Sequence, residues 1–260
     1  MQLSQKIIDA GLKFVYPFIY FGQWNKDKII YHIDNCKFKV RVGTSDKIAI
    51  WEIFNKKEYT DENNFKIKSS DIVVDIGGHI GAFTVFAAKQ AKQVYAYEAL
   101  KGNYDLLNEN IELNNLKNVR SFNVAVSDKI GEEEFFIAKG NVGGSSLYKT
   151  TYSKHKIKVP TITLKEIFSA NNLERINFLK IDAEGAEYKI LLNTPKSLLC
   201  KIDKIALEFH DNIREHGHNY KELIKLFKDN SFYVNVPTSF LIRILFKLGR
   251  IKAIRFNCHI

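Results

Sequence analysis

The sequence predicts an α/β fold in which helices cover both faces of a mostly parallel β-sheet. One observation is a series of short, nearly continuous apolar runs, which lie at residues 72–76, 94–98, 119–126, 176–181 and 204–209. The other is that apolar residues at helical spacing, at 80–91 and 103–116, separate the first three runs. Strands that are apolar on both faces and alternate with helices are typical of parallel sheets buried on both sides. The pattern therefore predicts a doubly wound, Rossmann-like architecture.

Composition indicates one main domain with an appendage. The chain has 260 residues, of which 45% are hydrophobic and 26% are charged. That composition excludes a disordered chain, and that length can bury a large core without disulfides. The three cysteines, Cys36, Cys200 and Cys258, are far apart and lack C-x-x-C spacing. This excludes a disulfide scaffold and a cysteine zinc cluster, and it suits a reducing compartment.

No apolar stretch approaches the roughly 20 residues that a transmembrane helix needs. The nearest, residues 12–22, is interrupted by Lys13 and Pro17, and no small-residue cleavage site follows it. We therefore expect a cytoplasmic protein, with contact to a membrane surface as an alternative.

Two regions depart from the alternation of strands and helices. Residues 1–68 contain an aromatic start of helical character, and then two strand-like runs and a helix, at 28–33, 37–42 and 46–57. We interpret them as an N-terminal cap on the main domain, residues 69–260. Segment 131–160 predicts irregular β-structure around a Gly- and Ser-rich loop at 141–146, and such loops are typical of mobile lids.

The most informative stretch is VVDIGGHIGAFT, at residues 73–84. A buried strand there contains Asp75, and a turn with Gly77, Gly78 and Gly81 leads into a helix. Glycines allow a tight turn and let a ligand approach the backbone at the helix N-terminus. The turn lies at the carboxyl edge of the first strand, where parallel sheets bind ligands. It lacks the first glycine of G-x-G-x-x-G and the Gly-Lys-Ser/Thr of a phosphate-binding loop.

Carboxylates at the ends of the first two strands indicate the kind of ligand. Asp75 is suited to accept from the ammonium group of an amino-acid-bearing ligand, directly or through water, whereas it would repel a pyrophosphate. Glu98 lies 23 residues later, at the end of the second strand, where a carboxylate can bind both hydroxyls of a ribose. An amino acid and a ribose without a phosphate describe S-adenosylmethionine. The alternative is that both carboxylates are ordinary strand-end residues.

Further segments follow the glycine turn in a recognisable order. Together they are VVDIGGHIGAFT (73–84), YAYEA (95–99), NVAVSD (123–128), GGSSL (143–147), VPTITLKEI (159–167), FLKIDAEGAEYKIL (178–191) and ALEFH (206–210). In these segments the chain resembles the FkbM-type S-adenosylmethionine-dependent methyltransferases, and the KIDAEGAE run is much more specific to that family than the glycine turn. The resemblance covers just over half of the chain. It implies a class I methyltransferase fold with a mostly parallel seven-stranded sheet.

The resemblance also implies S-adenosylmethionine as the cofactor and assigns contacts to it. From the glycine turn and the second strand these are Asp75, Gly77, Gly78, Gly81 and Glu98. The loop at 125–128 is expected to meet the adenine edge, with Ala125 and Ser127 as the candidate contacts.

Methyl transfer to an oxygen needs aligned substrates, a dry pocket and removal of the hydroxyl proton. The fourth and fifth strands end near Asp182 and in Glu208-Phe-His210, at the same edge of the sheet. His210 is suited to act as a general base near neutral pH, with Asp182 and Glu208 to orient it or to accept from the substrate. The alternative is a cluster that only orients cofactor and substrate. Glu184 and Glu187 are expected to cap the following helix.

A magnesium site is an alternative at the same edge. Asp182 with Asp211 and Asn212 is similar to the oxygen ligands of magnesium-dependent catechol-type O-methyltransferases. The FkbM pattern does not require the Asp-Asn pair, so our assignment contains no metal ligand. The H-x-H of His216 and His218 is more typical of a solvated loop than of a transition-metal site.

Charge and resemblance point to different acceptors. Lys and Arg exceed Asp and Glu by 39 to 29, an excess that favours anionic partners such as RNA or acidic lipid. An RNA ribose methyltransferase, however, would use a lysine where Glu208 and His210 lie, and no RNA-binding module is recognisable. The resemblance implies a hydroxyl of a sugar, glycolipid or natural product. An RNA methyltransferase and a non-catalytic binding protein remain alternatives.

Residues 237–260 contain five basic residues and no acidic one. Arg243, Lys247 and Arg250 would share one face of a helix, which favours peripheral contact with an anionic membrane and a lipid-linked acceptor. The alternative is an antiparallel pair of strands, 232–236 with 251–260, which the resemblance implies.

Overall fold

The computed structural model describes residues 28–138, 145–149, 153–211, 213, 217–238 and 248–255. Several expectations fall outside these residues, namely the aromatic start, the loop centre at 141–144, Asn212, His216, Arg243 and Lys247. Within the described part, no helix combines the length and the apolar character that crossing a membrane requires.

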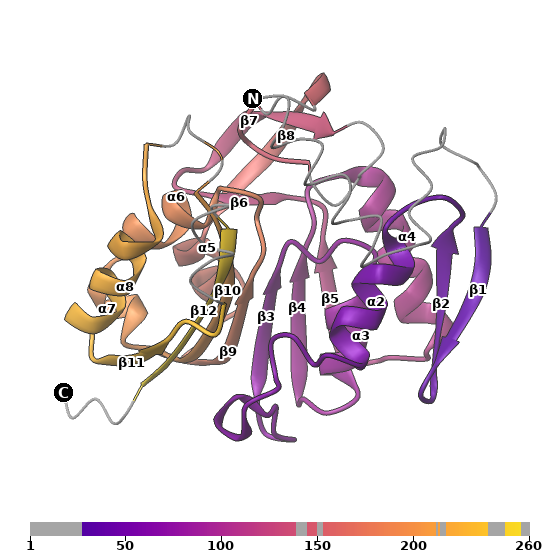
Figure 1. The fold of residues 1–260 in the computed structure, drawn as a ribbon, viewed down its shortest axis with the longest axis horizontal. Coiled ribbons are helices and arrows are strands. Elements are labelled where there is room, and N and C mark those ends of the chain that lie inside the picture. The colour runs from indigo at the N-terminus through magenta and orange to yellow at the C-terminus, as the bar shows by residue number, and fades with distance from the viewer. Residues whose placement is uncertain are drawn as a thin grey trace.

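A seven-stranded sheet forms the centre of the molecule, with strand order β11-β12-β10-β9-β3-β4-β5 (Figure 1). Its strands are β3 (Ile72–Ile76), β4 (Gln93–Tyr97), β5 (Val119–Phe122), β9 (Ile176–Ile181), β10 (Ile202–His210), β11 (Phe232–Asn235) and β12 (Leu248–Arg255). β12 runs antiparallel to both of its neighbours, and the remaining pairs are parallel. The predicted α/β class, with a mostly parallel seven-stranded sheet of the class I methyltransferase type, is therefore confirmed.

The described helices include the three that the sequence predicts at 46–57, 80–91 and 103–116, with shifted ends. They are α2 (Asp46–Phe54), α3 (Ala82–Ala88), α4 (Lys101–Leu113), α5 (Leu164–Ala170), α6 (Glu187–Leu192), α7 (Lys196–Leu199) and α8 (Tyr220–Asp229), and a 3-10 turn, η1, lies at Asn63–Phe65. Helix α3 begins later than predicted because the glycine turn continues to Gly81, whose φ of +89° is not helical.

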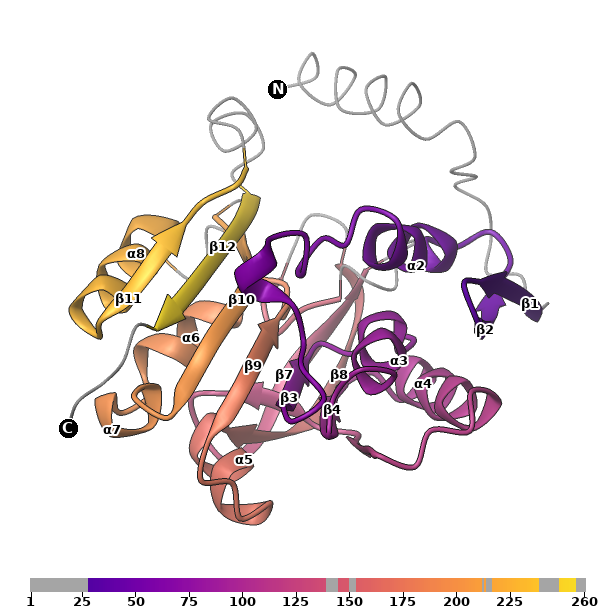
Figure 2. The ribbon, with the colours of Figure 1, turned by 90° about the horizontal axis from the view of Figure 1, so that it is seen from below.

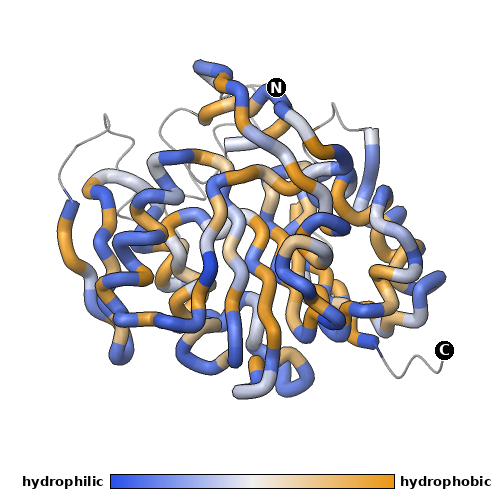
Figure 3. Tube along the Cα trace, turned by 180° about the vertical axis from the view of Figure 1, so that it is seen from behind, coloured by the Kyte–Doolittle hydropathy of each residue, from blue (hydrophilic) through white to orange (hydrophobic). Residues whose placement is uncertain are grey.

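Alternate residues of the strands point into two cores. Val73 and Phe178 face a core completed by α2, α3 and α4. Val74 and Leu179 face the other core, which α5, α6, α7 and α8 complete. Figure 2 shows these two groups of helices on opposite sides of the sheet, and Figure 3 shows hydrophobic stretches along the central strands. The helices thus cover both faces, as the near-continuous apolar runs predict.

The apolar run at 119–126 is not one strand. β5 ends at Phe122, and β6 (Ala125–Ser127) belongs to a separate sheet with β7 (Gly131–Ala138) and β8 (Ser153–Thr163). β7 and β8 form an antiparallel pair rather than the irregular structure predicted for 131–160. Cross-strand charge pairs such as Lys156 with Glu134 accompany that pairing and stabilise it.

The described part of the N-terminal cap packs directly on the main domain. β1 (Lys28–Ile33) and β2 (Cys36–Arg41) form a hairpin, and Asn110 of α4 and Asn114, the residue that follows α4, hydrogen-bond to the backbone of β2. Phe38 enters the core that α3 also fills. The cap therefore shares a core with the main sheet.

The C-terminal strands form the antiparallel pair that was one alternative for this region. β11 pairs with β12, so Arg250 lies in a strand and the expected helix through it is wrong. Its guanidinium lies 3.3 Å from Glu58 Oε1, and Arg255 donates to the backbone oxygens of Leu199 and Asn230. These basic residues make contacts within the molecule.

Candidate active site

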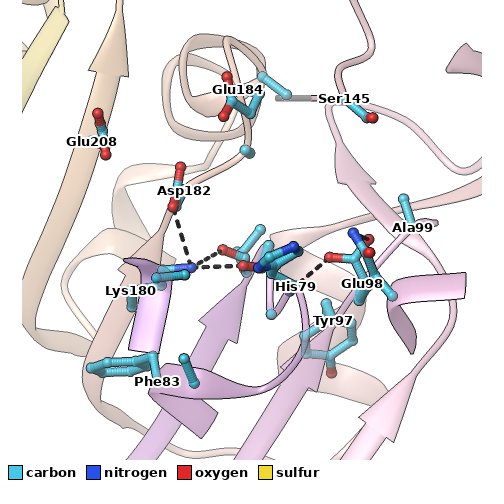
Figure 4. Close-up of a pocket in the computed structure, with 18 of the residues that line it drawn as sticks. His79, Phe83, Tyr97, Glu98, Ala99, Ser145, Lys180, Asp182, Glu184 and Glu208 are labelled. Carbon is cyan, nitrogen blue, oxygen red and sulfur yellow. Dashed lines mark hydrogen bonds and ion pairs between the residues drawn. The ribbon is translucent and has the colours of Figure 1, made fainter. Parts of the chain in front are cut away.

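A cavity of about 280 Å³ opens at the carboxyl edge of the main sheet, beyond β3, β4, β9 and β10. Gly77, Gly78 and Glu98 line one end, which we call the glycine-turn end. Asp182 and Glu184 line the opposite end together with Glu208, and we call this the acidic end (Figure 4). Helix α2 and the sheet of β6 and β7 contribute further walls.

The glycine turn excludes a side chain at Gly77 and leaves little room for one at Gly78. Gly77 has a φ of +77°, and a Cβ there would lie 1.8 Å from the backbone oxygen of Asp182. A Cβ at Gly78 would lie 2.7 Å from Leu107 Cδ1. Both glycines line the cavity, so bare backbone forms this wall. Gly81 packs against Leu107 behind the turn, and it is not a lining residue.

Asp75 lies behind the turn rather than in the cavity. It is fully buried, its Oδ2 accepts from Thr84 Oγ1 at 2.6 Å, and its Oδ1 lies 3.2 Å from Lys180 Nζ. Lys180 also donates to the backbone oxygen of Gly77 at 2.7 Å. Burial alone would lower the pKa of Lys180, but the charges of Asp75 and Asp182 outweigh it and raise that pKa. The expected direct contact of Asp75 with a ligand is corrected: Asp75 holds Lys180, and Lys180 holds the turn.

Glu98 lies at its predicted position, directly after β4. Its side chain lines the cavity and is nearly buried. Oε2 accepts from the N–H of His79, and Oε1 accepts from the N–H of Leu100, both at 2.8 Å. Burial nevertheless raises the pKa of Glu98 to about 7. The carboxylate is held firmly and keeps lone pairs for further donors.

Sequence reasoning missed Lys180 and His79 at the glycine-turn end. His79 Nε2 lies 3.3 Å from Arg41 Nη2 and 3.5 Å from Asp46 Oδ1, so the N-terminal cap reaches the turn. Burial lowers the pKa of His79 to about 4, so its ring is neutral near pH 7. A lysine inside an apolar strand and a histidine between glycines were the signals available in the sequence.

The segment at 125–128, which is expected as a loop but consists mostly of β6, is divided between two cavities. Ala125 lines the cavity next to Val124, in an apolar wall. Ser127 lines a separate cavity, and its Oγ donates to Glu133 Oε1 at 2.6 Å. The expected contact of Ser127 with the adenine edge is therefore corrected, because β6 turns this side chain away from the main cavity.

The acidic end brings together the three predicted catalytic residues. Asp182, Glu208 and His210 each offer one ligand atom within 4.8 Å of the other two. His210 is only 5% exposed and is not a lining residue. Its Nδ1 lies 2.9 Å from Glu187 Oε1, and its Nε2 lies 3.4 Å from Glu184 Oε2. Glu187, expected only as a helix cap, thus also holds the histidine.

Crowding of the carboxylates changes their proton affinities. Burial and the charge of Asp182 raise the pKa of Glu208 well above its ordinary value. Burial raises the pKa of Glu184 to about 7, although His210 opposes this. Burial alone would lower the pKa of His210, but Glu184 and Glu187 outweigh it and raise that pKa well above its usual range. His210 therefore holds a proton at neutral pH, which disfavours its expected role as a free base.

Asp211 takes no part in this cluster. Its Oδ1 accepts from the hydroxyl of Tyr188, and its Oδ2 accepts from the N–H of Tyr220 at 3.2 Å. Across the described residues, Asp182, Glu208 and His210 are the one group of His, Cys, Asp or Glu side chains close enough to hold an ion together. The geometry thus disfavours the magnesium alternative that was built on Asp211.

Comparisons with known proteins identify the family of the chain. The family model described as "Methyltransferase FkbM domain" matches residues 75–234. "Methyltransferase 1" of Beauveria bassiana is 24% identical over 198 residues, which cover 67% of this chain and 79% of that protein. A probable cobalt-precorrin-6B C(15)-methyltransferase of Methanocaldococcus jannaschii is 30% identical over 112 residues, 43% of this chain and 60% of that protein.

Among solved structures, an rRNA methylase from Streptococcus thermophilus superposes with a TM-score of 0.48 and 12% identity. That match covers 79% of this chain and 96% of the other. An FkbM methyltransferase from Methylobacillus flagellatus gives a TM-score of 0.47 and 11% identity, covering 79% of this chain and 52% of the other.

Proposed function

This chain belongs to the FkbM methyltransferase family, and from that premise we propose that it methylates a hydroxyl oxygen of a sugar, glycolipid or small natural product. When bound, S-adenosylmethionine supplies a methyl group on a sulfonium, ready for displacement. The observation that carries the proposal is the two-ended cavity, with a glycine-turn end that fits this cofactor and an acidic end suited to hydroxyl groups.

The glycine-turn end fits S-adenosylmethionine in its chemistry. Glu98 offers a carboxylate beside the turn, suited to the two hydroxyls of a ribose. The bare backbone of Gly77 and Gly78 permits a close approach, and the wall at Val124 and Ala125 suits an adenine ring. We assign the cofactor contacts to these residues. Asp75 and Gly81 support the turn from behind.

We assign removal of the hydroxyl proton to the acidic end. Asp182 Oδ2 accepts from Tyr59 Oη at 3.2 Å and lies 3.8 Å from Lys180 Nζ, so its carboxylate is held in place. Glu184 lines the same end, and a pKa of about 7 suits a group that exchanges protons at neutral pH. His210 lies against Glu184 and positions it, while Asp182 and Glu184 face the acceptor.

The acidic end weighs against an RNA acceptor. Besides Glu98, carboxylates line the cavity from three parts of the chain, namely Glu52, Glu58, Asp182, Glu184 and Glu208. The members of this set that are ionised repel phosphates, which dominate the binding of nucleic acids. The net charge of +10 therefore does not describe the surface that an acceptor meets.

An isotope experiment tests the proposal. The full chain is incubated with fractionated small-molecule, glycan and RNA extracts and with cofactor that carries a 13C-labelled methyl group. We expect a labelled product whose NMR shift is that of an O-methyl ether. A label on nitrogen, on carbon or on RNA would contradict the proposed acceptor. The control is Asp182→Asn, which should lose the labelled product if the transfer depends on the acidic end.

A further inference from the structure

The acidic end contains a set of side chains that the transfer of a methyl group alone does not require. Asp182 directly follows β9, and Glu208 and His210 belong to β10, the parallel neighbour of β9. Their ligand atoms lie within 4.8 Å of one another. Nitrogen and oxygen ligands lie about 2.0–2.2 Å from a divalent ion, so neighbouring ligand atoms lie about 3–3.5 Å apart. A small inward movement of these side chains would therefore bring all three into contact with one ion.

His210 is held in the way that metal-binding histidines usually are. Its Nδ1 lies 2.9 Å from Oε1 of Glu187, a residue with no exposed surface. The other oxygen of Glu187 accepts from the N–H of Gly185 at 2.8 Å, so this carboxylate is itself fixed. Histidines that bind metals almost always donate their second ring N–H to such a partner. Nε2 of His210 faces the acidic end and lies 3.4 Å from Glu184 Oε2, so an ion that binds here has to displace the proton on Nε2 and this contact with Glu184.

The charges around the cluster are unbalanced. Besides Asp182 and Glu208, the carboxylates of Glu58, Glu184 and Glu187 face it. Lys180 shares its charge between Asp75 and Asp182, and Arg250 pairs with Glu58. The side chain of Glu208 forms no hydrogen bond or ion pair with any residue that the structure describes, and Figure 4 shows it near Asp182 at this side of the cavity. A bound cation would provide what this carboxylate lacks.

We propose that Asp182, Glu208 and His210 bind a divalent ion of the first transition row. In this site Glu187 orients the imidazole of His210. One imidazole with two carboxylates suits such ions better than calcium, which prefers oxygen ligands alone. The ion faces the cavity through Asp182 and Glu208, where it can hold an acceptor oxygen. That last role rests on the proposed function, whereas the binding of the ion does not.

Direct binding of Mn2+ tests the site without any turnover. The full chain is stripped with a chelator and titrated with Mn2+, and free ion is followed by electron paramagnetic resonance. We expect one saturable site per chain, weakened about tenfold or more by Glu208→Gln or by Glu187→Gln. The control is Glu58→Gln, which removes a neighbouring carboxylate outside the ligand set and should change affinity less than about threefold.

Several outcomes would overturn the site. One is the absence of saturable binding of Mn2+ or Zn2+. Another is an equal loss of Mn2+ affinity in Glu58→Gln and Glu208→Gln, which would indicate a general attraction of cations to the acidic end. Binding of amine-bearing acceptors in place of metal would mean that the cation belongs to the substrate. Thermal melting and cofactor calorimetry on each variant exclude misfolding. If methyl transfer stays complete after chelation, the ion has no role in the reaction, and the proposed function still stands.

Discussion

The two ends of the cavity treat charge in opposite ways. At the glycine-turn end, Glu98 accepts from two backbone N–H groups, and Lys180 is bonded to the turn and to buried Asp75. At the acidic end, Asp182 and Glu208 face other carboxylates, and their mutual repulsion contributes to the raised pKa of Glu208. One end is organised before a ligand arrives, while the other gains stability when a proton or a cation arrives.

This difference indicates that the glycine-turn end is the rigid part of the site and that the acidic end is the adaptable part. The glycine-turn end receives a ligand of fixed chemistry, so backbone donors and close packing can fix its geometry in advance. The acidic end has to exchange a proton with an acceptor, so a carboxylate such as Glu184, whose pKa is about 7, is useful there. Substitutions at the two ends should therefore fail in different ways.

The largest effect is expected from Gly77→Ala. The added Cβ would overlap the backbone oxygen of Asp182, and the φ of +77° adds strain. We expect no measurable cofactor binding in calorimetry and a free energy of unfolding lower by about 2–5 kcal/mol in urea denaturation. Gly43→Ala is the matched control, because Gly43 has the same φ of +77° but open space around it. If Gly43→Ala loses as much cofactor affinity and stability as Gly77→Ala, the close packing of Gly77 against the backbone of Asp182 is not what matters.

Asp182→Asn should separate chemistry from cofactor binding. The substitution keeps the shape of the side chain and removes the charge that we assign to proton removal. We expect turnover to fall about 100-fold, with cofactor affinity within a few-fold of the original. Rapid-quench assays with labelled cofactor measure the first quantity, and calorimetry measures the second. Unchanged turnover would mean that alignment alone drives the transfer.

The sequence predicts the main sheet well because its signals are local. The runs that became β3, β4 and β9 are apolar over the length of a strand, and burial on both faces requires just that. The run at 119–126 misled because its break depends on a distant contact. Asn123 Nδ2 donates to the backbone oxygens of Glu98 and Ala99, which separates β5 from β6.

The candidate site divides in the same way. Glu98 could be predicted because its spacing from the glycine turn follows from one helix and two strands. The partner of Asp75 could not, because Lys180 lies more than a hundred positions away and meets it through the pairing of β3 with β9. The protonated state of His210 likewise depends on Glu184 and Glu187, whose charges reach it only in the folded chain.

Glu98→Gln should weaken the cofactor and strengthen the fold. Losing a charged acceptor should lower cofactor affinity about tenfold, measured by calorimetry at pH 8. Because burial raises the folded-state pKa of Glu98 from 4.5 to about 7, ionisation costs stability as pH rises through this interval, and the full cost is present above about pH 7. Glutamine avoids that cost, so the variant should melt at a higher temperature at pH 8.

The pH dependence of cofactor binding tests whether Glu98 binds the ribose. Cofactor affinity of the unmodified chain should fall as pH drops through about 7, because Glu98 becomes protonated. In Glu98→Gln this dependence should be absent. A variant with unchanged affinity, or with the same pH profile, would show that the ribose is bound elsewhere.

The smallest effect is expected from Ser127→Ala, which tests the boundary of the glycine-turn end. Ser127 donates to Glu133 at 2.6 Å outside the main cavity, so removing its hydroxyl should cost about 1 kcal/mol of unfolding free energy. Cofactor affinity should stay within about twofold, since no contact to the cavity is lost. Ala125→Val, one loop position within the cavity wall, should weaken the cofactor instead by crowding it. A reversed order of the two affinities would place the adenine edge at Ser127.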